Sequence, residues 1–301
     1  MSWLSKVEQN KPKSSLFVIT YGPNGVGKTY SAAKLGKNVL FTGPEQGNAF
    51  LPFKVSNLPA PESFQQQLQM LDEIIAAQHN FDTLVFDSLD HFEPMIWEHT
   101  CKVLSRGDKK YSSIEDFGFA KGYIYCLAYW NEFFTRMKKL SEKMNVVMIA
   151  HAKIKAFQDP TLTQGYDRYE IKLHDKAAAL AKELVDAVLF CTYDTVVTTG
   201  DAKAKAFGTD RVMFTGYRPG AEAKNRYGLP EKMPLDLSLI QKHIEAGSTT
   251  QTIEEMQSTI ASLLTRIDNE KLKDTVKEHL NKIGNDAAGL ARLIQKLETQ
   301  I

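Results

Sequence analysis

The distribution of apolar and polar residues along the chain predicts strands that alternate with helices. Short apolar runs rich in β-forming residues, typical of buried strands, occupy residues 16–21, 38–42, 81–87, 145–150 and 185–193. Apolar residues at helical spacing lie between these runs and predict helices over residues 29–35, 63–79, 90–105, 113–144 and 177–183. A chain in which strands and helices alternate in this way favours an α/β fold with a mostly parallel central sheet.

The pattern changes after the fifth predicted strand. Residues 195–199 and 211–216 predict antiparallel strands added to one edge of the sheet. A polar stretch at residues 247–252 then marks a boundary. Apolar stripes at helical spacing predict three helices beyond it, over residues 252–267, 269–283 and 286–301. We therefore expect a large α/β domain over residues 1–246 and a small helical appendage over residues 247–301.

Residues 152–174 lack a clear period and contain Pro160 and Gly165, which predicts a long irregular loop. Long loops in compact domains are usually functional or disordered. Basic and aromatic residues are interleaved here, as in loops that bind single-stranded nucleic acid: Lys153, Lys155, Phe157, Tyr166, Arg168, Tyr169 and Lys172. Three acidic residues in the same stretch oppose this interpretation: Asp159, Asp167 and Glu170.

Composition narrows the class of protein. The 301 residues are 43% hydrophobic and 24% charged, as in ordinary globular proteins, and the formal net charge is +1. Any nucleic acid would therefore bind a local patch or many assembled subunits. No apolar run has the length of a membrane span and residues 1–15 lack a signal-peptide core, so we expect a cytoplasmic protein with no membrane partner. Cys126 and Cys191 lie in apolar runs and are predicted to be buried thiols, and the histidine spacing predicts no structural zinc.

The stretch between the first predicted strand and helix fits the phosphate-binding pattern G-x-x-x-x-G-K-[ST]. Its glycines let backbone N–H groups point at phosphate oxygens, and the helix start adds partial positive charge. A glycine-rich turn that fits by chance is the alternative, but the strand before and the helix after favour a true site. We expect ATP to bind here, with Lys28 reaching the β- and γ-phosphates and Thr29 holding Mg²⁺. The expected nucleotide-binding residues are Gly22, Pro23, Asn24, Gly25, Val26, Gly27, Lys28, Thr29 and Tyr30.

Three polar residues follow predicted strands at the edge where open α/β sheets bind ligands. Glu45 comes shortly after the second strand, Asp87 ends the third, and His151 directly follows the fourth. Asp87 is predicted to hold Mg²⁺, as the strand-end aspartate of P-loop enzymes does. Asp90 is the local alternative, and it could instead cap the following helix. His151 is either a structural residue or a sensor of the γ-phosphate, which its position favours.

Near the end of the large domain, Lys224 and Arg226 stand two residues apart, so their side chains would point the same way from an extended strand. A basic pair on the surface is one interpretation. The other is a pair of fingers that reaches a phosphate on a neighbouring subunit. The sequence leaves both open.

Together these motifs resemble those of RecA-like P-loop ATPases. They resemble more closely the phage-encoded AAA-type ATP-binding family, which includes Sak-type single-strand annealing proteins. The resemblance covers residues 16–234, and Ala-Lys-Asn-Arg-Tyr-Gly-Leu-Pro at residues 223–230 is its most diagnostic segment. The phosphate loop also carries it, together with residues 41–47, 85–88, 149–151, 165–170 and 185–190.

The resemblance implies a role for each candidate residue. Glu45 would be the base that orients the attacking water, Asp87 would serve Mg²⁺ and His151 would sense the γ-phosphate. Lys224 and Arg226 would act in trans across a subunit interface, where a finger of this kind is worth ~10³ to 10⁵ in rate. RecA itself has an amide side chain at the sensor position, so His151 departs from that pattern.

The resemblance also implies partners and a location. The protein would be a DNA-stimulated ATPase that assists homologous recombination or single-strand annealing as a homo-oligomeric ring or filament. Residues 152–174 would contact single-stranded DNA, and a single-strand binding protein would be a further partner. A phage-encoded protein of this kind would work in the host cytoplasm.

Two functions of other classes fit part of the pattern. An ATP-gated assembly or binding module with little turnover would use ATP as a structural ligand, but it has no need of a positioned carboxylate such as Glu45. A P-loop kinase for a small molecule would carry an arginine-rich lid, which is not evident here. The late strands and the pair formed by Lys224 and Arg226 also argue against a kinase.

Overall fold

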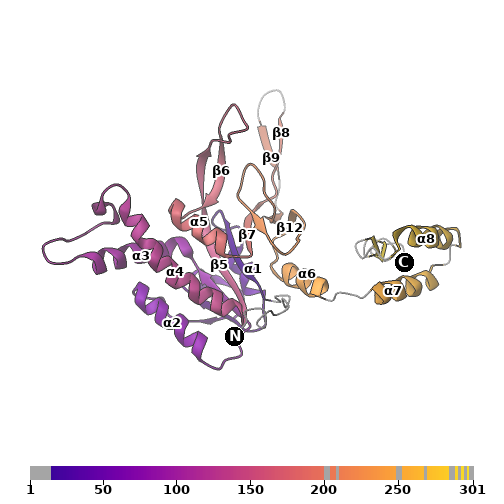
Figure 1. Cartoon of the computed structure of the whole chain (residues 1–301), viewed down its shortest axis with the longest axis horizontal. Coiled ribbons are helices and arrows are strands. Elements are labelled where there is room, and N and C mark those ends of the chain that lie inside the picture. The colour runs from indigo at the N-terminus through magenta and orange to yellow at the C-terminus, as the bar shows by residue number, and fades with distance from the viewer. Residues whose placement is uncertain are drawn as a thin grey trace, which may run out of the picture. The chain divides into compact units, whose positions relative to one another are not determined.

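The computed structural model describes residues 15–199, 204–207, 210–248, 253–267, 270–284, 289–290, 293–294 and 297 (Figure 1). The chain divides into two compact units, Met1–Ile244 and Glu245–Ile301. The first contains a large sheet with helices on both faces, and the second is helical in its described part. Each is treated below by itself.

The sheet of the first unit has the strand order β12-β10-β7-β1-β5-β4-β2-β3. Its parallel part consists of β1 (Phe17–Gly22), β2 (Val39–Thr42), β3 (Ser56–Asn57), β4 (Thr83–Asp87), β5 (Asn145–Phe157) and β7 (Ala187–Tyr193). Antiparallel strands form the other edge, namely β10 (Arg211–Phe214), β11 (Lys224–Asn225) and β12 (Lys232–Pro234). The predicted α/β class, with a mostly parallel central sheet and antiparallel edge strands, is confirmed.

Helices bury both faces of this sheet. One face carries α2 (Phe64–Ala76), α3 (Leu89–Leu104), α4 (Lys121–Ser141) and α5 (Asp175–Leu184), and the other carries α1 (Lys28–Ala33) and the first part of α6 (Ser238–Ser248). Alternate residues of β1 point to opposite faces of the sheet: Phe17 and Ile19 pack with the first group of helices, and Val18 packs with α1. Strands covered on both faces consist of apolar residues without polar alternation. The central strands have this composition, and their continuous apolar runs are the signal from which they are predicted.

Local signals set the ends of two predicted helices. The Ser63 side chain accepts a hydrogen bond from the backbone N–H of Gln66 and so caps α2. The helix predicted over residues 113–144 is divided: a 3₁₀ helix, η3 (Ile114–Phe117), ends at Gly118, whose φ of 68° favours glycine, and α4 follows. A second 3₁₀ helix, η2 (Gly47–Phe50), follows the turn after β2.

The irregular loop predicted over residues 152–174 is wrong. β5 continues beyond the sheet to Phe157 and pairs with β6 (Tyr166–Ile171) in an antiparallel hairpin that projects from the first unit (Figure 1). The register joins Ala152 to Ile171 and Phe157 to Tyr166. Apolar and basic residues alternate over 152–156, and this short period-two pattern is the signal of a strand.

Both predicted late strands are present, but only β10 joins the edge of the large sheet, so the placement predicted for residues 195–199 is wrong. β8 (Val196–Thr199) pairs with β9 (Ala204–Phe207) in a separate two-stranded sheet. β8 and β9 lie in the segment that connects β7 to β10. The two ends of this segment are joined by a hydrogen bond from the backbone N–H of Asp194 to the carbonyl oxygen of Asp210 at 2.7 Å.

The described part of the second unit contains the end of α6, then α7 (Ile253–Thr265), α8 (Glu270–Ile283) and helical residues at 289–290, 293–294 and 297. The last predicted helix therefore lies partly outside the described residues. Apolar side chains from the last three of these segments form one cluster: Ile260, Leu263, Ile267, Val276, Leu290, Leu293 and Leu297. Across the described part of the whole chain, no helix has the length and apolar character needed to cross a membrane.

Candidate nucleotide-binding site

The phosphate-binding motif forms the turn between β1 and α1. β1 ends at Gly22 and α1 begins at Lys28, so the strand–loop–helix context predicted from the sequence is present. Gly27 adopts φ 107°, and a Cβ added to it would lie 3.0 Å from Nη1 of Arg211. A glycine is therefore suited to this position by its backbone conformation and by the space around it. A turn of this kind brings backbone amides close to a bound phosphate.

Lys28 lies inside this turn. Its side chain is 6% exposed, and the ammonium group donates hydrogen bonds to the carbonyl oxygens of Gly22 and Pro23, both at 2.9 Å. Burial lowers the pKa of the ammonium group, while nearby acidic groups act in the opposite direction. A phosphate would be a stronger partner for this charge than two carbonyl groups, because both members of that pair are ionised.

Thr29 and Asp87, the residues predicted to hold Mg²⁺, lie in contact. The hydroxyl group of Thr29 donates to Oδ2 of Asp87 at 3.0 Å. Asp87 is 2% exposed. Burial, followed by the negative charge of Glu45, raises the pKa of Asp87 to about 7. Hydroxyl and carboxylate oxygens are ligands that suit Mg²⁺, so the donor set fits this ion.

Glu45 lies between this pair and α3. Its backbone N–H donates to the carbonyl oxygen of Asp87 at 2.9 Å. A Cβ added to Gly47 would lie 3.5 Å from Oδ2 of Asp87 and 4.0 Å from Oε1 of Glu45. The other carboxylate oxygen, Oε2, is 3.1 Å from Nδ1 of His91. One oxygen of Glu45 therefore lies on the side of the predicted Mg²⁺ site and the other contacts a histidine.

His151 is held by a buried carboxylate. β5 places it opposite Gly22, its backbone N–H donates to Oδ1 of Asp90 at 3.0 Å, and its ring Nδ1 is 2.9 Å from Oδ2. Burial of Asp90 would raise the pKa of its carboxyl group, but the hydrogen bonds and charge of His151 outweigh it and lower the pKa to about 2. The interpretation of Asp90 as a helix cap is wrong, because Ser88 is the N-cap of α3 and Asp90 contacts a histidine from within the first turn.

The side chains of Lys28, Thr29, Glu45, Asp87 and His151 line a cleft of about 550 Å³, which is within the usual size of ligand pockets. The phosphate loop, the segment from Glu45 to Pro52, the end of β4, the start of α3 and the middle of β5 contribute its walls. Lys172 adds a cation to the lining: its side chain is 59% exposed and its Nζ lies 3.7 Å from Oδ2 of Asp90. Its backbone N–H donates to the carbonyl oxygen of His151 at 2.9 Å.

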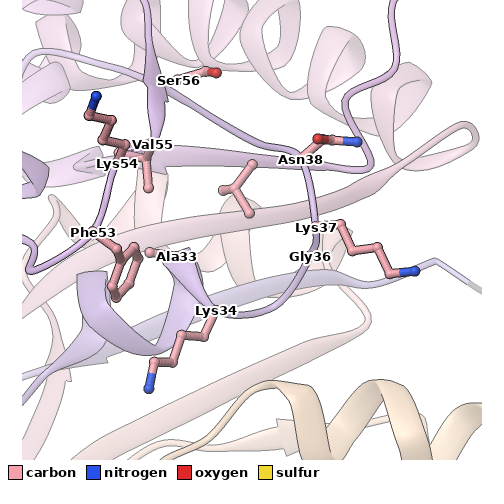
Figure 2. Close-up of a pocket in the computed structure, with 10 residues that line it drawn as sticks. Ala33, Lys34, Gly36, Lys37, Asn38, Phe53, Lys54, Val55 and Ser56 are labelled. Carbon is pink, nitrogen blue, oxygen red and sulfur yellow. The ribbon is translucent and has the colours of Figure 1, made fainter.

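A second cleft, of about 610 Å³, lies behind α1 and shares no lining residue with the first (Figure 2). Lys34, Lys37 and Lys54 line it without an acidic residue. Their ammonium groups point away from one another in Figure 2, so they do not converge on one anion. The chemistry predicted from the sequence therefore belongs to the first cleft.

The structure does not bring Lys224 and Arg226 to this cleft within one chain. β11 pairs with the start of β7, opposite Ala187 and Val188, whereas the phosphate loop follows the carboxyl end of β1. Lys224 donates to the carbonyl oxygens of Lys182, Glu183 and Val185 at 2.7, 3.2 and 2.8 Å, so its ammonium group caps the end of α5. Arg226 is 56% exposed and lies 3.5 Å from Asp186. The trans contact stays a prediction, and of the two only Arg226 has a largely exposed charge.

Several residues near the cleft were missed from the sequence. Tyr193 and Arg211 stand opposite each other on β7 and β10, and the Tyr193 hydroxyl donates to the carbonyl oxygen of Gly25 at 3.3 Å. Together they support the phosphate loop from one side. His91 and Lys172 were missed because their importance depends on contacts between elements. The only signal in the sequence was that His91 follows the strand-end Asp87 by four residues and lies in the first turn of the next predicted helix.

The fold and the site together define a P-loop nucleotide-binding protein of the α/β class. The model of the AAA domain family AAA_24 matches residues 14–227. This match covers more than half of the chain, so the chain belongs to that family. Among curated proteins, none matches the sequence.

Two solved structures resemble parts of the chain. The flagellar accessory protein FlaH from Methanocaldococcus jannaschii is 9% identical, with a TM-score of 0.30, and the match covers 71% of this chain and 90% of that protein. The second structure was reported as that of a DnaB-like replicative helicase and its interactions with primase. It is 8% identical, with a TM-score of 0.35. That match covers 71% of this chain and 59% of the helicase chain. At these TM-scores neither likeness bears on function.

Proposed function

We propose that this protein is a Mg²⁺-dependent ATPase of the RecA-like class. The observation that supports it most is the grouping of three oxygen-bearing side chains beside the phosphate loop. Thr29 and Asp87 are hydrogen-bonded at 3.0 Å, and Oε1 of Glu45 lies next to them across Gly47. P-loop enzymes hold Mg²⁺ with a threonine or serine and a strand-end aspartate and keep a further polar group for the attacking water.

Each side chain has a separate task in this proposal. Lys28 leaves its two carbonyl partners and binds the β- and γ-phosphates. Glu45 orients the attacking water, and Nε2 of His151 contacts the γ-phosphate, since Nδ1 is engaged by Asp90. Mg²⁺ held by Thr29 and Asp87 supplies charge neutralisation, which is the main requirement of phosphoryl transfer.

The main rival is a module that binds ATP as a structural ligand and hardly cleaves it. The two functions differ in their dependence on Glu45. For an ATPase, Glu45→Gln should bind ATP with near-normal affinity and lose turnover by ~10²- to 10⁴-fold, the usual contribution of a positioned base. Glu73→Gln, the same change on an exposed position of α2, is the matched control and should retain turnover. Equal turnover in both variants would remove Glu45 from the mechanism.

We also propose that single-stranded DNA contacts the hairpin of β5 and β6. The hairpin is connected to the cleft through both strands, because His151 belongs to β5 and Lys172 follows β6. Ile154 is 64% exposed and Tyr169 is 37% exposed. The basic side chains, however, have carboxylate partners, with Lys153 and Lys155 near Asp175. The contact we propose therefore relies more on stacking of bases than on phosphate neutralisation.

Assembly into a homo-oligomer, ring or filament, is the third part of the proposal. Arg226 would supply a positive charge to the neighbouring site, while Lys224 would hold the end of α5 that supports it. Recombination or single-strand annealing, with a single-strand binding protein as a partner, is the process we propose for such an assembly. The direct test is ATP turnover measured against protein concentration, with and without single-stranded DNA. A specific activity that rises with concentration supports assembly, and a constant one contradicts it.

A further inference from the structure

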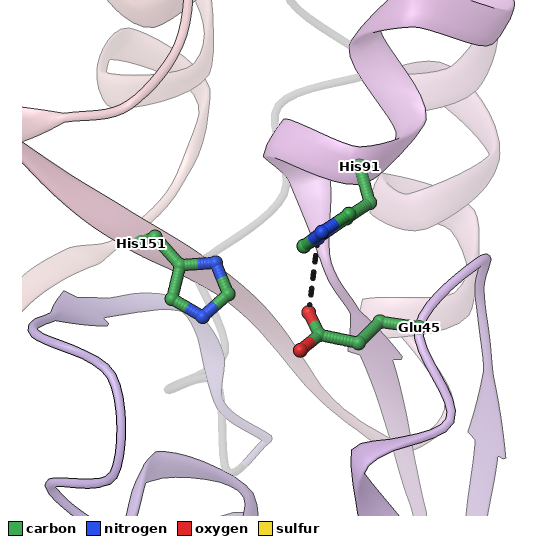
Figure 3. A group of neighbouring side chains, drawn as sticks. All are labelled: Glu45, His91 and His151. Carbon is green, nitrogen blue, oxygen red and sulfur yellow. Dashed lines mark ion pairs between the residues drawn. The ribbon is translucent and has the colours of Figure 1, made fainter.

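Glu45, His91 and His151 come from three separate elements and meet at one point of the cleft. Figure 3 shows them arriving from the loop after β2, from α3 and from β5. One donor atom from each lies within 4.8 Å of the other two. An ion about 2.1 Å from each donor holds its ligands roughly 3 to 4 Å apart, so small side-chain rotations would close the group around an ion.

His151 is already oriented as a ligand. A carboxylate can only accept hydrogen bonds, so the contact of Nδ1 with Asp90 at 2.9 Å places a proton on that nitrogen. The neutral ring then has a free lone pair on Nε2. A histidine that binds a metal usually has its second nitrogen bonded in this way to a carboxylate, which fixes the tautomer and the orientation of the ring. Asp90 is 2% exposed, so this support is shielded from water.

Glu45 offers an oxygen that lacks a full set of partners. Its Oε2 is buried and accepts no hydrogen bond from the described residues, and its contact is the ion pair with His91 at 3.1 Å (Figure 3). A buried carboxylate oxygen without a hydrogen bond is costly unless a cation faces it. His91 is 51% exposed, so its ring has room to turn. In the present arrangement Nδ1 of His91 also lies 2.8 Å from Oγ of Ser88.

The chemistry of the three donors selects the kind of ion. Mg²⁺ and Ca²⁺ prefer oxygen ligands only, whereas imidazole suits zinc, copper, iron and nickel. Two histidines and one glutamate form the donor set of zinc sites that keep a fourth position open. Such a site is distinct from the pair of oxygen donors on Thr29 and Asp87. Patterns of histidine spacing could not reveal it, because its ligands lie on three elements.

We propose that Glu45, His91 and His151 bind one divalent transition-metal ion, with zinc as the best fit, and that Asp90 positions His151 for it. The ion binds the carboxylate of Glu45 and Nε2 of His151, which are the two groups that would otherwise contact the attacking water and the γ-phosphate. Metal binding and ATP turnover therefore exclude each other, and zinc acts as a reversible inhibitor. This second statement rests on the proposed function, whereas the binding site itself does not.

Cobalt binding tests the site without nucleotide. The full chain, freed of metal, is titrated with Co²⁺ in excess Mg²⁺, and the visible absorption of cobalt reports nitrogen and oxygen ligation of low coordination number. We expect one saturating equivalent, displaced by Zn²⁺. Asp90→Asn should weaken binding by about 10- to 100-fold, as loss of an outer partner usually does. His91→Ala and His151→Ala should weaken it at least as much.

His279→Ala is the control, because this residue is an exposed histidine of α8 in the second unit. It should bind Co²⁺ as the unaltered protein does, and circular dichroism checks that each variant is folded. Two results would overturn the proposal: no saturable cobalt spectrum in the unaltered protein, or a Co²⁺ affinity in His91→Ala and His151→Ala equal to that of the unaltered protein. Inhibition of turnover by Zn²⁺, reversed by a chelator, is measured separately, so a failure of the ATPase proposal leaves the binding result intact.

Discussion

The carboxylate of Asp90 accepts a hydrogen bond from Nδ1 of His151 at 2.9 Å, and this contact sets which nitrogen of the ring faces the cleft. Asparagine at position 90 removes the negative charge that holds Nδ1, so the ring and its Nε2 are less firmly oriented toward the γ-phosphate. We expect Asp90→Asn to lower kcat for ATP by on the order of 10²-fold, the usual effect of losing one preorganised group. Because Asp90 acts through His151, the KM for ATP should change far less. A fall in kcat/KM caused only by weaker binding would assign Asp90 a structural role.

Mg²⁺ dependence is the second expectation. Asp87→Asn keeps the hydrogen bond partner of Thr29 but removes the negative charge beside the expected ion. We expect the Mg²⁺ concentration for half-maximal turnover to rise by about 10- to 100-fold, since a carboxylate ligand is replaced by a weaker one. A titration of phosphate release against Mg²⁺ measures this. An unchanged midpoint would mean that Asp87 does not serve the ion.

Lys224 and Arg226 should separate into a stabilising residue and a functional one. Lys224→Met removes an ammonium group from three carbonyl oxygens at the end of α5. We expect a loss of about 1 to 2 kcal/mol in the free energy of unfolding, reduced by water that reaches part of this site. Arg226→Ala breaks only an exposed contact at 3.5 Å, and its stability should change by less than about 0.5 kcal/mol.

Turnover then distinguishes their roles in the same two variants. If Arg226 acts in trans, Arg226→Ala should lose turnover while it keeps its melting temperature and its ATP affinity. Thermal and chemical denaturation, ATP binding and ATP hydrolysis are measured on both variants. Normal turnover in Arg226→Ala would contradict the trans role.

DNA binding should show a shallow dependence on salt. The log of the affinity for single strands falls with log salt by about 0.7 for each phosphate neutralised. Two of the hairpin's cations lie within ion-pair distance of Asp175, and Arg168 is 2.6 Å from Glu170. We therefore expect a slope shallower than about −1.5, together with a marked loss of affinity in Tyr169→Ala. A steep slope with no effect of Tyr169→Ala would assign the binding to another, basic surface.

The sequence predicts the core of the fold well, because strands buried on both faces are apolar throughout. The turn between β1 and α1 is also predicted, because its glycines follow the phosphate-binding pattern. The sequence also places Glu45, Asp87 and His151 at one edge of the sheet, since parallel strands end together there. These three residues do meet in one cleft. What the sequence does not supply is their second partners: Asp90 for His151 and His91 for Glu45 are contacts between different elements.

The β5–β6 hairpin is the part of the fold for which the prediction from sequence is wrong. The lack of a clear period, together with Pro160 and Gly165, made residues 152–174 resemble an irregular loop, although short alternation over 152–156 already indicated a strand. The cations that suggested a DNA contact are paired within the chain, with Arg168 only 10% exposed between Glu170 and Glu222. Charge counted along a sequence does not reveal which charges neutralise one another in space.

ATP hydrolysis by the purified full chain tests the central claim most directly. Phosphate release is measured at high protein concentration with single-stranded DNA, for the unaltered protein and for Lys28→Ala, with Mg²⁺ present or omitted. We predict steady turnover that requires both Mg²⁺ and Lys28, because the site depends on the ammonium group in the phosphate loop and on the ion beside Thr29 and Asp87. Tight ATP binding without phosphate release under all of these conditions would contradict the account.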